Sequence, residues 1–180
     1  MLEKKNYYSS SIEHGQQQNN SFTIGANTSE VKVMLYWPDK PASLFASSTL
    51  VNDLDLVITS PDGTIYRPLI LNADPGSVLN TAIAGEDHSN NMEQVIIRNP
   101  IPGLYTVTVK GFLIPFGPQP YFVSYNILDK GLKLLSPLKK DSWKGGETQV
   151  IKWIEPGENP ITYQVDFSTD GGLNWQTIGT

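Results

Sequence analysis

Cysteine is absent from this chain of 180 residues, and clustered basic residues are lacking as well. The absence of cysteine excludes disulfides, thiolate metal sites and a cysteine nucleophile. Thirteen Lys and Arg against eighteen Asp and Glu give a formal net charge of −5, which disfavours nucleic acid and an anionic membrane surface as partners. No apolar run approaches the roughly 18 residues that span a bilayer. The hydrophobic content of 39% is nevertheless sufficient for a buried core.

The N-terminal segment lacks the pattern of a signal peptide. Its basic pair, Lys4 and Lys5, is followed by a polar, serine-containing stretch instead of an apolar one. Either the protein is cytoplasmic or the chain is a piece of a longer exported protein. We expect the second, a protein that is secreted or held at the cell surface, because the C-terminal module also looks incomplete. Residues 1–19 contain little that can bury surface, and we expect them to form a loose polar lead-in.

Helical periodicity is also missing, and alternation with a period of two takes its place. Apolar residues alternate with polar ones in three segments: Val31, Val33, Leu35 and Trp37; Leu54, Leu56 and Ile58; Tyr105, Val107 and Val109. This pattern of β-branched and aromatic residues predicts half-buried strands, and fifteen glycines and thirteen prolines supply the turns between them. The chain is predicted to be all-β, with residues 20–128 forming a jelly-roll β-sandwich.

The pattern changes near residues 128–131, which we interpret as a domain boundary. Residues 131–180 contain Ser136-Pro137, Gly145-Gly146, Trp153, the stretch STDGG at 168–172, and Trp175. This series resembles the start of a bacterial immunoglobulin-like or fibronectin-like repeat. Such a sandwich needs about seven strands in roughly 100 residues, so we expect a truncated module of about four strands. Its open edges would lean on the first domain or pair with another molecule.

Two oxygen-rich segments suggest a cation site. The stretch NDLDL at 52–56 places two carboxylates on one face of a strand, with Cβ atoms about 6.5 to 7 Å apart. The loop at 86–93 adds carboxylates, amides and backbone carbonyls, the ligands that Ca²⁺ prefers. The predicted calcium ligands are Asp53, Asp55, Asp87, Asn90, Asn91 and Glu93. In the alternative interpretation, the two aspartates form a solvated strand face and the loop residues only cap and turn the chain.

No catalytic site is expected in this chain. Asp87, His88 and Ser89 are adjacent in sequence, whereas a working triad converges from separate segments. We interpret His88 as a surface-loop histidine, and a GxSxG segment is absent.

Aromatic residues near a proline-rich loop suggest a second kind of site. Phe112, Phe116 and Tyr121 flank the sequence GPQP and are the aromatic residues most expected to be exposed. Exposed rings stack on planar or apolar ligand faces. We therefore consider these three residues as candidates for binding a glycan or a protein ligand, with core packing as the alternative.

Three segments together resemble a known family. Residues 30–62, 87–94 (DHSNNMEQ) and 99–121 are similar to the P-domain-like β-sandwich that follows the catalytic domain in many bacterial subtilisin-like serine proteases. In that family NDLD and NNxE recur, here at 52–55 and 90–93, and some members bind calcium in this domain. The resemblance implies a non-catalytic domain that packs on an upstream catalytic domain of the same polypeptide and supports its stability.

One departure from the family pattern concerns the residue after Trp37. Relatives carry an acidic residue directly after this tryptophan, whereas here Pro38 intervenes before Asp39. The alternative to a protease accessory domain is a carbohydrate- or protein-binding module of a cell-surface protein with no protease attached.

Overall fold

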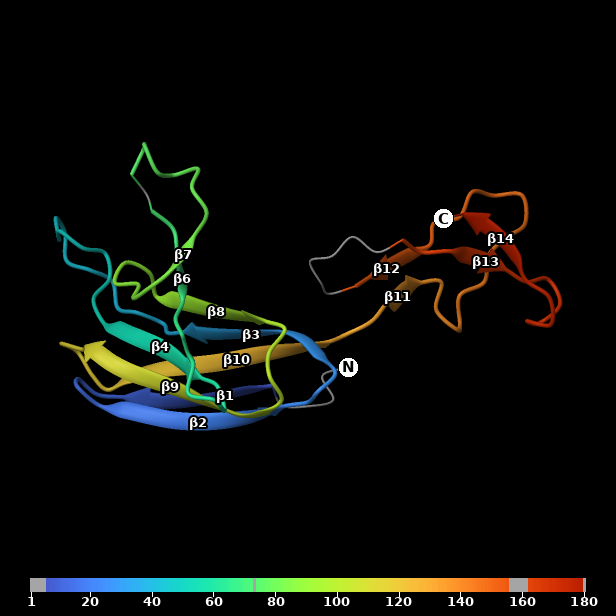
Figure 1. The fold of residues 1–180 in the computed structure, drawn as a ribbon. Coiled ribbons are helices and arrows are strands. Elements are labelled where there is room, and N and C mark those ends of the chain that lie inside the picture. Colours follow the sequence, from blue (N-terminus) through green and yellow to red (C-terminus); the bar gives the residue numbers. More distant parts are fainter. Residues whose placement is uncertain (1–5, 73, 156–161, 180) are drawn as a thin grey trace.

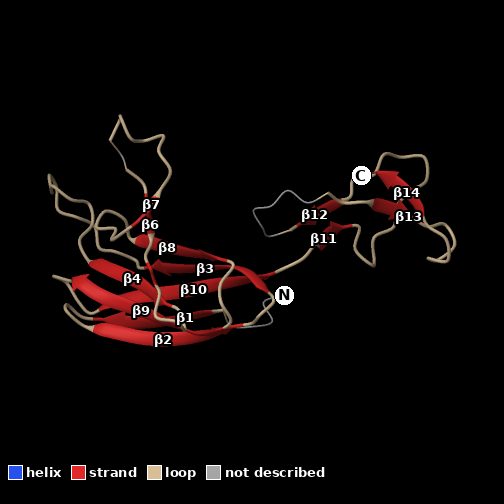
Figure 2. Ribbon diagram, viewed as in Figure 1, coloured by secondary structure: helices blue, strands red, loops and turns tan. Residues whose placement is uncertain are grey.

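The fold consists of strands and loops. A computed structural model describes residues 6–72, 74–155 and 162–179, and these residues contain no helix (Figure 2). It follows that none of the described residues belongs to a helix able to cross a membrane. The prediction of an all-β fold is confirmed.

Residues up to 129 form two four-stranded antiparallel sheets packed face to face (Figure 1). One sheet has the order β1 (Tyr7–Ile12), β10 (Gln119–Asp129), β3 (Thr28–Tyr36), β8 (Met92–Arg98). The other has the order β2 (Gln17–Ile24), β9 (Gly103–Leu113), β4 (Asp53–Thr59), β5 (Ile65–Tyr66). The chain thus folds back on itself in nested pairs: β1 with β10, β2 with β9, β3 with β8 and β4 with β5. Nested pairing over two sheets is a jelly roll, and the short pair β6 (Leu69–Ile70) and β7 (Ile83–Ala84) is inserted between β5 and β8.

The N-terminal residues belong to this sandwich. Strands β1 and β2 form edges of the two sheets, so the prediction of a loose lead-in is wrong for residues 7–19; residues 1–5 lie outside the described part. The side chain of Ile12 is fully buried and Tyr8 packs against the core. The serines, glutamines and asparagines of these strands lie mostly on the exposed side, and this composition concealed the strand pattern.

The core lies between the sheets and is built from the predicted alternating positions. All ten apolar residues named in the three predicted strand segments are buried. The indole of Trp37 is completely enclosed, and its Nε1 donates a hydrogen bond of 2.8 Å to the carbonyl of Asn52. This bond fixes the end of β3 against the start of β4, where the candidate site lies.

The described residues of the C-terminal segment form strands but no buried core. It contains β11 (Lys133–Ser136) paired with β12 (Lys152–Ile154), and β13 (Val165–Phe167) paired with β14 (Gln176–Gly179). None of the described residues from 131 to 179 is buried. The described residues of this segment form four strands, and each pair forms a separate two-stranded sheet.

Candidate metal centre

The site lies where an edge of one sheet meets an edge of the other. Strand β5 pairs only with Ile58 and Thr59 of β4, so the first half of β4 has no strand on that side. Glu93 of β8 fills this position, because its Oε2 accepts a hydrogen bond of 2.6 Å from the backbone N–H of Leu56. A buried carboxylate therefore bridges the two sheets at this edge.

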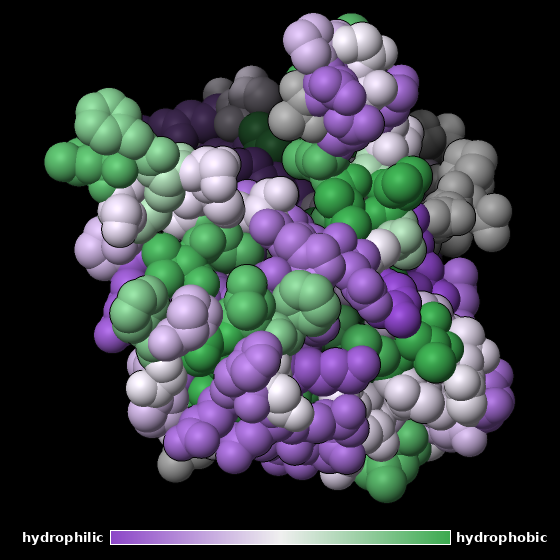
Figure 3. All heavy atoms as spheres, turned by 90° about the vertical axis from the view of Figure 1, so that its left-hand side faces the viewer, coloured by the Kyte–Doolittle hydropathy of each residue, from purple (hydrophilic) through white to green (hydrophobic). Residues whose placement is uncertain are grey.

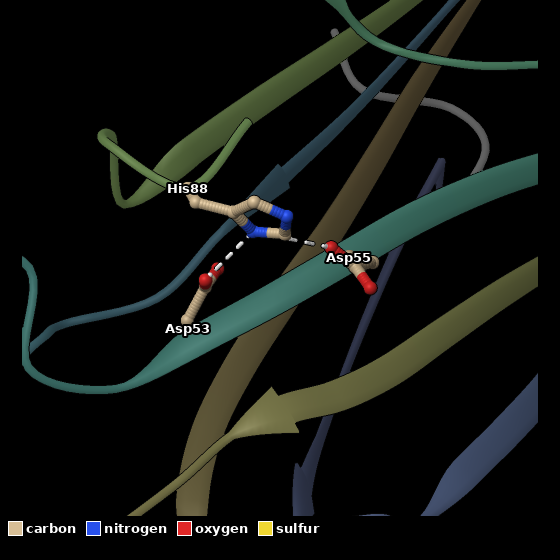
Figure 4. Close-up of side chains that lie close together, drawn as sticks. All are labelled: Asp53, Asp55 and His88. Atoms are coloured by element: carbon tan, nitrogen blue, oxygen red, sulfur yellow. Dashed lines mark hydrogen bonds and ion pairs between the residues drawn. The ribbon is translucent and has the colours of Figure 1, made fainter. Parts of the chain in front are cut away.

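Asp53 and Asp55 alternate on β4 and share one face, as the NDLDL stretch predicted. Their residues are only 5% and 7% exposed, so the alternative of a solvated strand face is wrong. His88 projects from the loop before β8 towards both carboxylates (Figure 4). Its Nδ1 lies 2.8 Å from Asp53 Oδ2 and 3.9 Å from Asp55 Oδ1. One ligand atom from each of the three residues lies within 4.8 Å of the others, and this cluster could hold a metal ion.

Three carboxylate oxygens at this edge are buried without a hydrogen-bond partner among the described residues. They are Asp53 Oδ1, Asp55 Oδ1 and Glu93 Oε1. An unpartnered buried oxygen is costly, and for a charged group the cost is larger. Two of them belong to the cluster of Asp53, Asp55 and His88, and an ordered water or a bound ion would satisfy such oxygens.

Burial also changes how these carboxyl groups titrate. Loss of solvent raises the pKa of Asp53 to about 6, although the neighbouring His88 opposes the shift. Burial likewise raises the pKa of Asp55. Burial is again the main cause for Glu93, whose pKa rises to about 9 despite the N–H donated by Leu56; the three aspartates 53, 55 and 87 add repulsion. A bound cation would reverse these shifts, because it favours the charged forms.

The loop residues predicted as ligands have hydrogen bonds of their own. Asp87 Oδ1 accepts from the backbone N–H groups of Ser89 and Asn90, and the Asn90 amide donates to Asp87 Oδ2 at 2.7 Å. The Asn91 amide donates to the Trp37 carbonyl at 2.9 Å. These three residues shape the loop and join it to β3. The close cluster consists of Asp53, Asp55 and His88, with Glu93 beside it.

His88 is the residue that the sequence interpretation missed. It is an exposed residue, but its imidazole is paired with Asp53 and stacked on Phe112 with ring centroids 4.3 Å apart. His88 therefore lies in a surface loop, as interpreted, but its pairing with Asp53 was not foreseen. Its position beside Asp87, inside the oxygen-rich loop, was the only signal in the sequence.

The first residue of the NDLD stretch is a structural anchor. Asn52 is fully buried, its Nδ2 donates to Gln119 Oε1 at 2.6 Å, and its Oδ1 accepts from the Phe116 N–H at 3.2 Å. Asp39 holds the same segment from the other side, since its two oxygens accept from the N–H groups of Val51 and Asn52. Pro38 displaces Asp39 by one position from the family pattern, yet both carboxylate oxygens of Asp39 accept hydrogen bonds. These contacts fix the start of β4 and with it the position of Asp53.

The three candidate aromatic residues differ in exposure. Phe112 is 50% exposed and Phe116 is also exposed, with the Lys40 ammonium 5.4 Å from its ring centroid. Tyr121 is fully buried, so the expectation of an exposed ring is wrong for this residue. It points inward on β10, where its hydroxyl donates to Gln18 Oε1, and the next residue, Phe122, faces outward instead. Figure 3 shows the end of the sandwich near β4, with hydrophobic patches among hydrophilic residues.

Comparison with protein-family models gives no match for this chain, and comparison with curated protein sequences gives none.

Proposed function

We propose that this chain is a non-catalytic accessory β-sandwich that binds Ca²⁺ at the edge between β4 and β8. The observation that carries the proposal is the group of three buried, unpartnered carboxylate oxygens on Asp53, Asp55 and Glu93. A divalent cation would compensate their charge and satisfy their lone pairs. Binding to the folded state alone then stabilises the fold by mass action.

The donor set favours calcium over softer metals. Three of the four side chains at this edge supply carboxylate oxygens, which suit a hard cation. Cysteine, the ligand most characteristic of structural zinc, is absent. His88 is the one nitrogen donor, and for this reason Zn²⁺ is the metal against which calcium should be compared.

The accessory role is supported by the resemblance to the sandwich of exported bacterial subtilisin-like proteases. In this role the domain packs on an upstream catalytic domain and stabilises it. The contacts of both histidines fit a structural part: His14 Nδ1 accepts from the Ile114 N–H, and His88 pairs with Asp53. Extracellular fluid, where exported proteins work, is also rich in calcium, so a site of moderate affinity would be filled there.

Thermal melts in calcium and in excess chelator test the cation site. The melting temperature should rise in calcium. The free energy of unfolding should increase by about 2.7 kcal/mol when the concentration of free calcium exceeds the Kd a hundredfold. The rise should vanish in Asp53→Ala and persist in Asp74→Ala, which removes an exposed loop carboxylate. Equal melts of the unaltered protein in both buffers would overturn the site, and a larger rise with Zn²⁺ would replace calcium by zinc.

The protease association has a separate test in the coding sequence upstream of Met1. A reading frame that continues into a subtilisin-like catalytic domain supports the accessory role. A frame with no such domain would favour the alternative, a carbohydrate- or protein-binding module of a cell-surface protein.

A further inference from the structure

A hollow of about 330 Å³ opens beside the metal centre, on the outer face of the sheet that contains β4. Its volume lies within the range of small-molecule sites. The strand register explains its walls, because Gln17 of β2 lies opposite Lys110 of β9, which lies opposite Asp55 of β4. The side chains that matter for the argument are Gln16, Gln17, Asp55, Glu86, Lys110 and Phe112.

Asp55 belongs to both the hollow and the metal centre. It lines the hollow, it supplies one of the three clustered ligand atoms, and its Oδ1 is buried without a hydrogen-bond partner among the described residues. A cation held there would lie at the wall of the hollow. Asp53, Asp55 and His88 each offer one ligand atom, whereas calcium takes six to eight ligands. Several coordination positions therefore remain for water or for oxygens of a bound molecule.

The lining identifies the chemistry of that molecule. One aromatic ring, Phe112, is half exposed and is braced by its stack on His88. Around it lie an amide (Gln17), an ammonium (Lys110) and a carboxylate (Glu86), which together donate and accept hydrogen bonds. A phosphorylated ligand is disfavoured because Lys110 is the one basic side chain in the lining, and a purely apolar ligand is disfavoured by the polar walls. A saccharide matches the set, since it has an apolar ring face and a rim of hydroxyls.

We propose that the hollow binds a saccharide in a cation-dependent manner. Two neighbouring hydroxyls of the sugar replace water on the cation, Phe112 stacks on the sugar ring, and Gln17 and Lys110 contact the remaining hydroxyls. This inference depends on the proposed cation site, and it gives that site a ligand in addition to a stabilising role.

Saturation-transfer NMR on the full chain tests the inference with defined probes: the methyl glycosides of glucose, mannose and galactose, and lactose. At least one probe should give a signal in calcium that disappears in excess chelator. In Phe112→Ala and in Gln17→Ala, that signal should fall at least fivefold. Phe122→Ala is the matched control, because it removes an exposed ring from the outer face of the other sheet, and its signal should be unchanged.

The outcomes separate this inference from the cation site itself. If calcium raises the melting temperature but none of the four probes gives a signal, saccharide binding is overturned and the cation site is retained. A signal that persists in chelator, or that is equal in the Phe112→Ala and Gln17→Ala variants and in the unaltered protein, also overturns the inference. If calcium does not change the melting temperature, the proposed cation site is overturned, and the saccharide inference that depends on it is overturned too. Gln17→Ala guards against a folding defect in Phe112→Ala, since Gln17 is exposed on an edge strand.

Discussion

The sandwich and the C-terminal segment are both built from antiparallel strands, yet only the sandwich has an interior. Every described residue that is buried lies before residue 131. In the C-terminal segment, Trp175 is 63% exposed and Phe167 is also exposed. Two-stranded pairs are marginal in water, and three or more strands with a covered apolar face are needed for independent stability. Among the described residues beyond 131, apolar side chains such as Trp175 and Phe167 are thus present, but the two-stranded pairs do not cover them.

Aspartates show the same contrast between the two regions. Burial beside other acids raises the pKa of Asp53 in the sandwich to about 6. In the exposed hairpin turn before β14, hydrogen bonds from Asn174 and Ser168 lower the pKa of Asp170 to about 2. The first carboxylate is held where its charge is unfavourable, which is typical of functional positions. The second is held where its charge is satisfied locally, which is typical of a turn.

Replacing a tryptophan in each region should give the largest difference. Trp37→Ala leaves a large cavity and removes the bond to the Asn52 carbonyl, and we expect a loss of about 3 to 5 kcal/mol in the free energy of unfolding. Trp175→Ala should change the sandwich transition by less than about 0.5 kcal/mol. Chemical denaturation followed by tyrosine and tryptophan fluorescence measures both. A comparable loss in the two variants would show that the segment shares the core of the sandwich.

Replacing an asparagine in each region should give a smaller difference in stability. Asn52→Ala removes the hydrogen-bond partners of Gln119 Oε1 and of the Phe116 N–H at a buried position. The free energy of unfolding should fall by about 2 to 3 kcal/mol. Asn174→Ala removes only the exposed hydrogen bond from Asn174 Nδ2 to Asp170 Oδ2 and should leave the sandwich transition unaltered. Because Asn52 also positions Asp53, the first variant should in addition weaken the calcium-dependent rise in melting temperature. An unchanged calcium response in Asn52→Ala would mean that the start of β4 is held by other contacts.

The stability of the calcium-free sandwich should depend on pH in the direction set by Glu93. Its folded pKa of about 9 lies above the ordinary value of 4.5, so the folded state binds the proton more tightly than the unfolded state. Stability therefore falls as pH rises between these two values, and is highest on the acidic side of that window. From pH 9.5 to pH 7 in chelator, we expect a gain of about 2 to 3 kcal/mol, or roughly 8 °C.

Two variants check that this pH dependence comes from Glu93. Glu93→Gln keeps an acceptor for the Leu56 N–H and removes the titrating charge, so its melting temperature should be flat over the same range. Glu13→Gln, at an exposed position, should keep the original slope. Saturating calcium should flatten the slope of the unaltered protein as well. A slope that survives in Glu93→Gln would assign the effect to another group.

The strands of the central sheets could be predicted because their residues alternate strongly. Val31, Val33 and Leu35 are apolar at every second position, and this pattern places them in the core without further information. The edge strands could not be predicted in the same way. In β1 only Ile12 is buried and only Tyr8 is partly buried, and the serines between them resemble a disordered tail. Their structure comes from pairing with β10, a partner more than 100 residues away in the chain.

The site was partly predictable for a similar reason. Asp53 and Asp55 could be assigned to one face because a strand has a period of two. Glu93 could be placed near them only through the resemblance. His88 depends on the path of an irregular loop, and its pairing with Asp53 spans 35 residues, so no local pattern revealed it. Tyr121 shows the converse difficulty, since a shift of one position along β10 decides between the core and the surface.

Removing the C-terminal segment should have the smallest effect, and it tests the comparison most directly. A variant that ends at Lys130 retains all eight strands of the two large sheets. Because no described residue beyond it is buried, the sandwich loses little packing, and its melting temperature should change by less than about 2 °C. Differential scanning calorimetry of the two proteins measures this, and calcium should raise both transitions equally. A fall of 5 °C or more would show that residues 131–180 stabilise the sandwich through contacts made in solution, and the two regions would then have to be treated as one folding unit.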